Sequence, residues 1–283
     1  MVSRTGFSGN MEVGGMIEIL GFAFFQNAVI AGILAAIACG IIGSFVVVRG
    51  MVATSGGISH AAFGGIGLGF FLGVDPLLGA IVFTVGASVL IWYLNICELQ
   101  ETDTITGAIW AGGMAIGIVF VALTPGYTPD LFSYLFGNIL LVPTKEILLM
   151  GFLVLLILGV VSVLFTRLVA ITFDSEYARV MGLPVSALTL VLFILIALTA
   201  VLLISVVGII LVIALLTLPA ATARLFTHSL PAMMGSAIMI GVLTVISGIF
   251  LSYSFDLPSG ATIILVGSAI YAGALIRRHL ISS

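Results

Sequence analysis

The sequence predicts an all-α polytopic membrane protein with about eight to nine transmembrane helices. Hydrophobic residues make up 62% of the 283 residues and charged residues only 7%, whereas about a quarter of the residues in a soluble domain are charged. The apolar segments are long and lack the alternating pattern of a membrane β-barrel. In addition, most of the arginines fall on one side of the membrane when each apolar segment crosses once.

The N-terminal part of the chain contains a mixed segment and then three spans. Residues 1–25 include an apolar part that is too short to cross, so we expect an interfacial segment there. The first clear span covers residues 26–48. The second contains the glycine-rich stretch 56–69 and ends near Gly73, and the third covers residues 77–96 after an Asp-Pro turn.

Polar residues and prolines interrupt the middle of the chain. A fourth span, residues 104–123, follows a short acidic loop. The segment 124–145 contains three prolines, and its apolar core, 131–142, is too short to cross the membrane. It therefore predicts a short interfacial or re-entrant helix. A fifth span covers residues 146–164 and ends before the next arginine.

The longest polar interruption, residues 172–184, lies between the fifth span and a sixth span at 186–204. Asp174 can cap a short helix there, and Gly182 with the following Leu-Pro can end that helix. The sequence therefore predicts a short helix outside the membrane at this point.

Three more apolar segments complete the chain. Gly208 allows a sharp turn into a segment that covers residues 205–218 and is closed by Pro219. The last two spans cover residues 232–253 and 261–276, which are joined by a turn containing Asp, Pro and Gly.

The positions of the basic residues test this arrangement, because cytoplasmic loops carry an excess of Arg and Lys. If each segment crosses once, six arginines lie on one side, namely Arg49, Arg167, Arg179, Arg224, Arg277 and Arg278. Only Arg4 and Lys145 lie on the other side. We therefore expect residues 26–279 to form a single transmembrane domain whose segment 172–184 is cytoplasmic.

His60 is the only ionisable residue between Arg49 and Asp75, so it lies within a predicted span. A histidine in a bilayer is costly and usually faces a bundle interior or a water-filled path. The surrounding glycines allow neighbouring helices or a solute to approach the backbone. Two interpretations remain open: a conduit for a solute that imidazole can bind, or a histidine that only holds the bundle together.

The sequence lacks the signatures of an ATP-hydrolysing enzyme. It contains no Gly-x-x-x-x-Gly-Lys-Ser/Thr loop, and its single lysine is in a predicted external segment. The acidic residues lie in loops or at span ends, so no buried pair suits a proton or sodium relay. Active transport would therefore take its energy from a partner. The segment 172–184, with Asp174, Glu176 and Tyr177, is either the surface for that partner or an ordinary interfacial loop.

A series of short motifs runs in the same order as in a known family. The motifs are Phe25–Ile30, Gly43–Met51, Ile58–Ala61, Thr102–Gly107, Leu135–Leu140, Phe173–Pro184, Val207–Ala223 and Tyr253–Gly260. Together they resemble the permease subunits of the metal-type ABC importers, the family of zinc, manganese and iron uptake permeases. The resemblance covers about residues 24 to 276, and Ile58–Ala61 is similar to the end of the family's Asp-Ala-Ile-Ser-His-Ala signature.

The resemblance implies the ABC importer permease fold and a location in the plasma membrane. It also implies three partners: a second copy of the chain, a cytoplasmic ABC ATPase dimer that uses ATP, and an extracellular metal-binding delivery protein. The chain itself would be a transport subunit without a bound cofactor and without a nucleic-acid partner, and zinc or manganese would be its substrate.

The same resemblance implies roles for particular residues. His60 would contact the metal, and Ser59 would lie beside it in the transport pathway. Within the segment 172–184, the residues that couple the chain to the ATPase would be Asp174, Glu176, Tyr177 and Gly182.

One position departs from the family pattern. The family has an aspartate four residues before the histidine, where carboxylate and imidazole share a helix face and can bind one cation. Here that residue is Gly56. We predict an importer for a divalent transition metal, with zinc or manganese first and iron next. The departure leaves two alternatives: an ABC permease for a metal chelate or small organic solute, and an ATP-independent channel or carrier.

Overall fold

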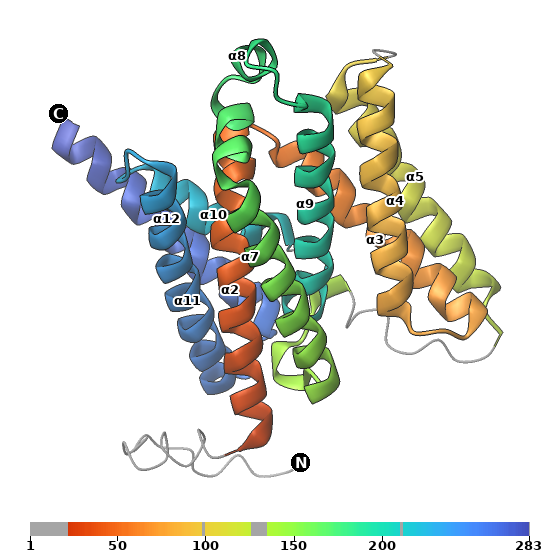
Figure 1. Cartoon of the computed structure of the whole chain (residues 1–283). Coiled ribbons are helices and arrows are strands. Elements are labelled where there is room, and N and C mark those ends of the chain that lie inside the picture. Colours follow the sequence, from red (N-terminus) through yellow and green to blue (C-terminus); the bar gives the residue numbers. More distant parts are fainter. Residues whose placement is uncertain (1–21, 98–99, 126–134, 210–211, 283) are drawn as a thin grey trace, which may run out of the picture.

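The computed structural model describes residues 22–97, 100–125, 135–209 and 212–282, and the described part of the chain contains helices and no strand (Figure 1). Its elements are, in order, α2 (Ala23–Arg49), α3 (Val52–Leu72), α4 (Pro76–Ile96), α5 (Thr102–Leu123), η1 (Ile139–Leu141), α7 (Thr144–Phe173), α8 (Ser175–Val180), α9 (Val185–Val207), α10 (Val212–Arg224), α11 (Leu230–Phe255) and α12 (Ser259–Ser282).

Seven described helices are long and apolar enough to cross a membrane: α2, α4, α5, α7, α9, α11 and α12. Helix α3 has 21 residues, as many as α4, but its glycines and polar residues make it less apolar. Helix α10 has 13 residues and is therefore only about 20 Å long. The described residues therefore confirm an all-α membrane protein, and the seven candidate spans together with α3 are roughly consistent with the expected eight to nine.

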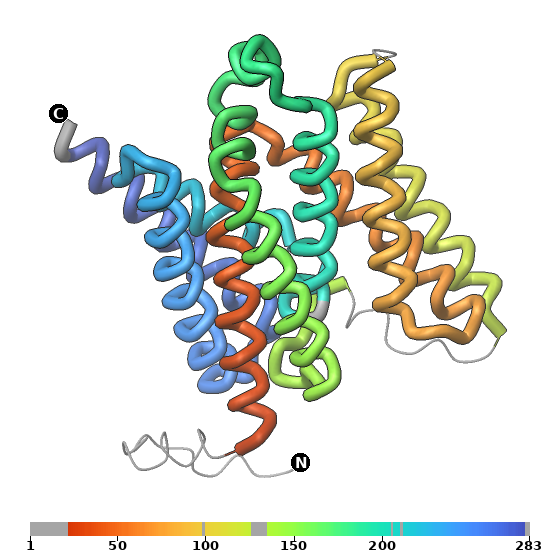
Figure 2. Tube along the Cα trace, viewed as in Figure 1, coloured from red at the N-terminus to blue at the C-terminus, as the bar shows by residue number. Residues whose placement is uncertain are grey.

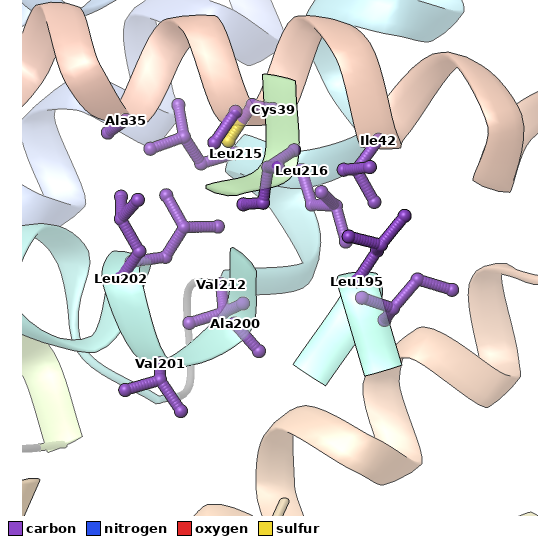
Figure 3. Packing of buried hydrophobic residues seen from close by; sticks show 14 of the residues in the cluster. Ala35, Cys39, Ile42, Leu195, Ala200, Val201, Leu202, Val212, Leu215 and Leu216 are labelled. Atoms are coloured by element: carbon purple, nitrogen blue, oxygen red, sulfur yellow. The ribbon is translucent and has the colours of Figure 1, made fainter. Parts of the chain in front are cut away.

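Helix α2 lies at the centre of the bundle and packs against α7, α9, α10 and α11. Small residues on α2 allow this close packing. A Cβ at Gly43, for example, would collide with the carbonyl oxygen of Leu216 in α10. Figure 3 shows Ala35, Cys39 and Ile42 of α2 among buried side chains of α9 and α10. Helices α2, α9 and α10 therefore contribute a large share of the apolar core, to which α7 and α11 also contribute.

Helices α3, α4 and α5 form a second group beside α9. The trace in Figure 2 leaves the α8 end of the bundle along α3, returns along α4 and descends again along α5. Helix α3 packs along both α4 and α5, and α4 also contacts α9. The helix that carries His60 is thus covered by neighbours on several sides.

The helix ends support the predicted orientation. In Figure 1 the ends of α2, α7, α10 and α12, where the arginines lie, are on the same side of the bundle as α8. Arg224 donates a hydrogen bond to the Val47 carbonyl at 3.1 Å, which ties the ends of α10 and α2 together. At the opposite end, Lys145 forms an exposed ion pair with Asp75, with 3.8 Å between Nζ and Oδ2.

Some predicted boundaries were wrong, including the end of the last span, because α12 continues past residue 276 to Ser282. Helix α7 runs through Arg167 to Phe173, because Leu168 and Ile171 beyond that arginine are buried and continue the helix. Pro219 does not close its segment but lies inside α10. A proline removes one helical hydrogen bond, but inside a bundle neighbouring helices make this tolerable.

Two other predictions fall partly outside the described residues. Of the predicted interfacial or re-entrant helix, the described part contains η1, whose Ile139 is fully buried and which packs against α2. Its residues 131–134 lie outside the described residues. Residues 1–21 also do, so the interfacial N-terminal segment stays a prediction.

Candidate functional site

His60 lies in the middle of α3 with 6% of its surface exposed. Its ring stacks on the Trp110 ring of α5, with 4.3 Å between the centroids and an angle of 9°. The Nδ1 atom is buried and has no hydrogen-bond partner among the described residues. A buried polar atom without a partner is unusual and calls for a water, an ion or a functional role. The Nδ1 atom is therefore an unsatisfied polar atom inside the helix bundle.

Glycines bring α3 close to its neighbours. A Cβ at Gly57 would collide with the Thr106 side chain, and a Cβ at Gly64 would lie 2.9 Å from the Gly113 carbonyl oxygen. On α5, a Cβ at Gly113 would lie 2.8 Å from the Ala61 Cα. Each glycine of α3 meets a neighbouring residue in this way. The glycine face is therefore filled by other helices and does not line an open path.

The position of the missing aspartate is also filled. A Cβ at Gly56 would lie 2.7 Å from Cδ1 of Ile213 in α10 and 3.6 Å from Cζ3 of Trp110. An apolar chain end and an indole ring thus occupy the space that a carboxylate would need. His60 consequently faces an aromatic ring in place of an acidic partner.

The hydroxyl groups near His60 differ in their availability. Ser59 donates to the Ser55 carbonyl at 2.7 Å, so its proton is used within α3. Thr106 of α5 is 2% exposed, and its Oγ1 has no hydrogen-bond partner in the described part of the chain. Thr106 lies four residues before Trp110, on the same face of α5. We did not single out Thr106 or Trp110 from the sequence, although both lie in or near the Thr102–Gly107 motif.

A single copy of the chain does not bring several metal ligands together. Among the described residues there is no group of three or more His, Cys, Asp or Glu side chains that could hold a metal ion. Transition-metal sites normally use several such ligands. A metal at His60 would therefore need further ligands from a second copy, from water or from a delivered ligand.

Helix α8, which was predicted as the surface for a cytoplasmic partner, connects α7 and α9 at the arginine-rich end of the bundle (Figure 1). The middle of α3, which carries His60, lies away from this end. Asp174 caps this helix as expected, since its Oδ1 accepts a hydrogen bond from the Tyr177 amide at 2.8 Å. Gly182 adopts a left-handed conformation with φ of 79° just after the helix. The glycine is suited to this conformation because it has no Cβ.

The outer face of α8 and its flanks is unusually apolar for an exposed helix. Tyr177 is 61% exposed and Val180 is 84% exposed. Phe173 and Met181 are exposed on either side, and Glu176 is also exposed. Exposed apolar residues that lie together commonly mark a protein-binding surface.

Comparisons with known proteins cover nearly the whole chain. The model of the ABC 3 transport family matches residues 21–278. An uncharacterized membrane protein of Synechocystis sp. is 46% identical over 264 residues, which are 93% of this chain and 94% of that protein. The manganese import system permease protein ScaB of Streptococcus gordonii is 36% identical over 250 residues, 88% of this chain and 90% of ScaB.

Solved structures agree with the fold. PsaBC from Streptococcus pneumoniae, in complex with Fab, matches with a TM-score of 0.84 at 34% identity, over 93% of this chain and 95% of that chain. A putative metal-chelate type ABC transporter in an inward-facing conformation matches with a TM-score of 0.73. At 14% identity, the second match bears on the fold alone.

Proposed function

Since the chain belongs to the ABC 3 transport family, we propose that it is the membrane-spanning permease subunit of an ATP-driven importer for a divalent transition metal ion. It is a multi-pass protein of the cell membrane, and the relatives named above include a manganese import permease. Manganese and zinc are the first candidate substrates, and iron is the next. The chain is a transport subunit, and ATP hydrolysis belongs to a partner.

The buried, unpartnered Nδ1 of His60 is the observation that carries this proposal. Imidazole is a good ligand for zinc and other transition metals. In a homodimer, two copies of His60 can complete one coordination sphere with water or with Thr106. Ser59 lies next to His60 and belongs to the same pathway. We propose alternating access between two copies of the chain as the transport mechanism.

We propose α8 as the point at which the ATPase drives this motion. The exposed side chains of Tyr177 and Glu176 are available to a cytoplasmic partner, Asp174 holds the start of the helix, and Gly182 holds its end. Because α8 connects α7 and α9, a displacement of α8 moves two long helices together. An extracellular delivery protein would supply the metal at the opposite side.

One alternative substrate is supported by a specific observation. The space beside Gly56 is filled by Ile213 and Trp110, which favours a less charged solute such as a metal chelate. The other alternative, an ATP-independent channel, has less support. The glycines of α3 that would line its path are packed against neighbouring residues.

Uptake by proteoliposomes tests the proposal. The chain would be reconstituted with its cognate ATPase and delivery protein, and metal accumulation measured with ATP or with a non-hydrolysable analogue on the ATPase side. We expect accumulation only with hydrolysable ATP, and a large loss on Tyr177→Ala or Glu176→Ala. Tyr271→Ala, in α12, is the control for loss of a tyrosine. Accumulation by the chain alone, without ATPase, would contradict the proposal and favour a channel.

A further inference from the structure

A cavity of about 730 Å³ lies between the ends of α2 and α4, helix α8 and the start of α9. Figure 1 shows these helix ends at the arginine-rich end of the bundle. It is separate from His60, and α8, the proposed ATPase-binding helix, forms one of its walls. Arg49 from α2 and Arg179 from α8 both line it. Among the described residues that line it there is no carboxylate. The described side chains that line the cavity therefore carry two positive charges and no negative one.

The polar side chains in the cavity are not fully paired. Arg49 donates from Nη2 to Thr189 Oγ1 at 3.0 Å, but its buried Nη1 has no hydrogen-bond partner in the described part of the chain. The same holds for the buried Oδ1 of Asn95. A buried charged donor without a partner costs more than a neutral one. Arg49 therefore keeps an unpaired charged donor at the wall of the cavity, which would be satisfied if the side chain turned toward an acceptor bound there.

The start of α9 adds further positive potential. Ser186 and Ala187, in the first turn of this 23-residue helix, line the cavity. The first amides of a helix have no partner within it and carry the positive end of the helix dipole. Helix α9 has no side-chain cap and no acidic residue in its first turn. Arginines that line the same cavity as the start of a helix are a typical arrangement for binding phosphate.

The position of the cavity suggests where an anion comes from. Trp92 lines it and donates through Nε1 to the Ser186 carbonyl at 2.8 Å. Tryptophan is enriched at the level of the lipid headgroups, and basic pockets between transmembrane helices on the cytoplasmic side bind anionic headgroups. The cavity also has apolar walls, which include Ile96 and Phe193.

We propose that this cavity binds a phosphate group, supplied by an anionic phospholipid of the inner leaflet or by free phosphate. The bound group joins Arg49 of α2 and Arg179 of α8 to the first turn of α9. Because α8 is the proposed ATPase-binding helix, occupancy would hold it in one position relative to the bundle. That regulatory consequence rests on the proposed function, whereas the binding itself does not.

Tryptophan fluorescence measures this binding directly. The chain has two tryptophans, Trp92 and Trp110, so Trp110→Phe leaves only the one in the cavity. This variant would be titrated with potassium phosphate against matched potassium chloride in detergent. It would then be placed in nanodiscs of phosphatidylcholine with increasing phosphatidylglycerol. We expect a saturable fluorescence change with one source or both.

Arginine variants in the same background show whether the cavity is the site. Each of Arg49→Gln and Arg179→Gln removes a charged hydrogen bond, so we expect affinity to fall about 10-fold or more. Arg278→Gln is the control, because Arg278 is an exposed arginine near the end of α12, away from the cavity. Since Arg49 also binds Thr189, its variant could fail to fold. Arg179 is exposed, so Arg179→Gln keeps the test decisive.

The outcomes separate the possibilities. Saturation by phosphate alone identifies free phosphate as the ligand, and saturation by phosphatidylglycerol alone identifies a lipid headgroup. No saturable response to either source, or equal affinities for Arg179→Gln and Arg278→Gln, overturns the proposal. Glu98 lies outside the described residues and is the first carboxylate in the sequence after the end of α4. Binding that occurs only after Glu98→Gln would mean that this carboxylate fills the cavity, which also overturns the proposal.

Discussion

Adjacent glycines on α3 should respond very differently to the same added methyl group. At Gly57 a Cβ would collide with the Thr106 side chain and lie 3.0 Å from the Thr106 carbonyl oxygen. Backbone cannot move aside without separating α3 from α5. At Gly56 the nearest atom is Cδ1 of Ile213, the flexible end of a side chain. Gly57→Ala should therefore destabilise the protein, and Gly56→Ala should be tolerated.

The magnitude follows from a comparison with a glycine in open space. A Cβ at Gly112 of α5 would have no neighbouring atom within 4 Å. Gly57→Ala and Gly112→Ala each gain about 1 kcal/mol from the higher helix propensity of alanine. This gain cancels in the difference between the two variants. Overpacking costs about 1–3 kcal/mol. We expect Gly57→Ala to lower the free energy of unfolding by that amount relative to Gly112→Ala.

Unfolding by sodium dodecyl sulfate in mixed micelles measures these differences. Thr106→Ser removes the methyl group that the new Cβ would meet. The double variant Gly57→Ala/Thr106→Ser should therefore recover part of the loss, with a coupling energy of about 0.5–3 kcal/mol. Equal stability of Gly57→Ala and Gly112→Ala would refute the close α3–α5 packing that holds His60 against Trp110.

Three further predictions concern other parts of the chain. Gly56→Asp places a carboxylate one helical turn before His60, and Ile213→Ala makes room for it. The metal affinity of the double variant, measured by calorimetry, should therefore rise at least 10-fold. Unchanged affinity would contradict the idea that residues 56 and 60 share one face of α3. Asp174→Ala removes the cap of α8, which costs about 1 kcal/mol locally, and should lower ATP-driven uptake while leaving binding of the delivery protein unchanged. Lys145→Ala breaks an ion pair whose side chains are 88% and 45% exposed, so the free energy of unfolding should change by less than about 1 kcal/mol; a larger loss would show that the pair with Asp75 is structural.

Long apolar runs made most of the fold predictable from the sequence. The predicted spans correspond to helices, because in a bilayer every backbone polar group must be paired within the segment. The cap at Asp174 and the turn at Gly208 were also predictable, since each depends on neighbours in sequence. The continuation of α7 and the position of Pro219 inside α10 depend on packing against other helices, which no local pattern contains.

The candidate site was predictable only in part. The glycine in place of an acid at position 56 is visible in the sequence, as is the isolated histidine. The space that the missing aspartate would occupy is filled by Trp110 of α5 and Ile213 of α10. Both residues are far from Gly56 in the sequence, and only the packing of the helices places them beside it. The same is true of Arg49, whose bond to Thr189 joins residues 140 positions apart.

Metal-dependent ATP hydrolysis tests the central claim most directly. The chain would be reconstituted with its cognate ATPase, and the delivery protein would be loaded with manganese, zinc or iron in turn. We compare wild type with His60→Ala and use His228→Ala, an exposed histidine, as the control. We predict that one metal-loaded form stimulates hydrolysis, that His60→Ala abolishes the stimulation and that His228→Ala keeps it. The absence of stimulation by any metal, with His60→Ala equal to wild type, would contradict an intramembrane metal ligand and indicate a different solute.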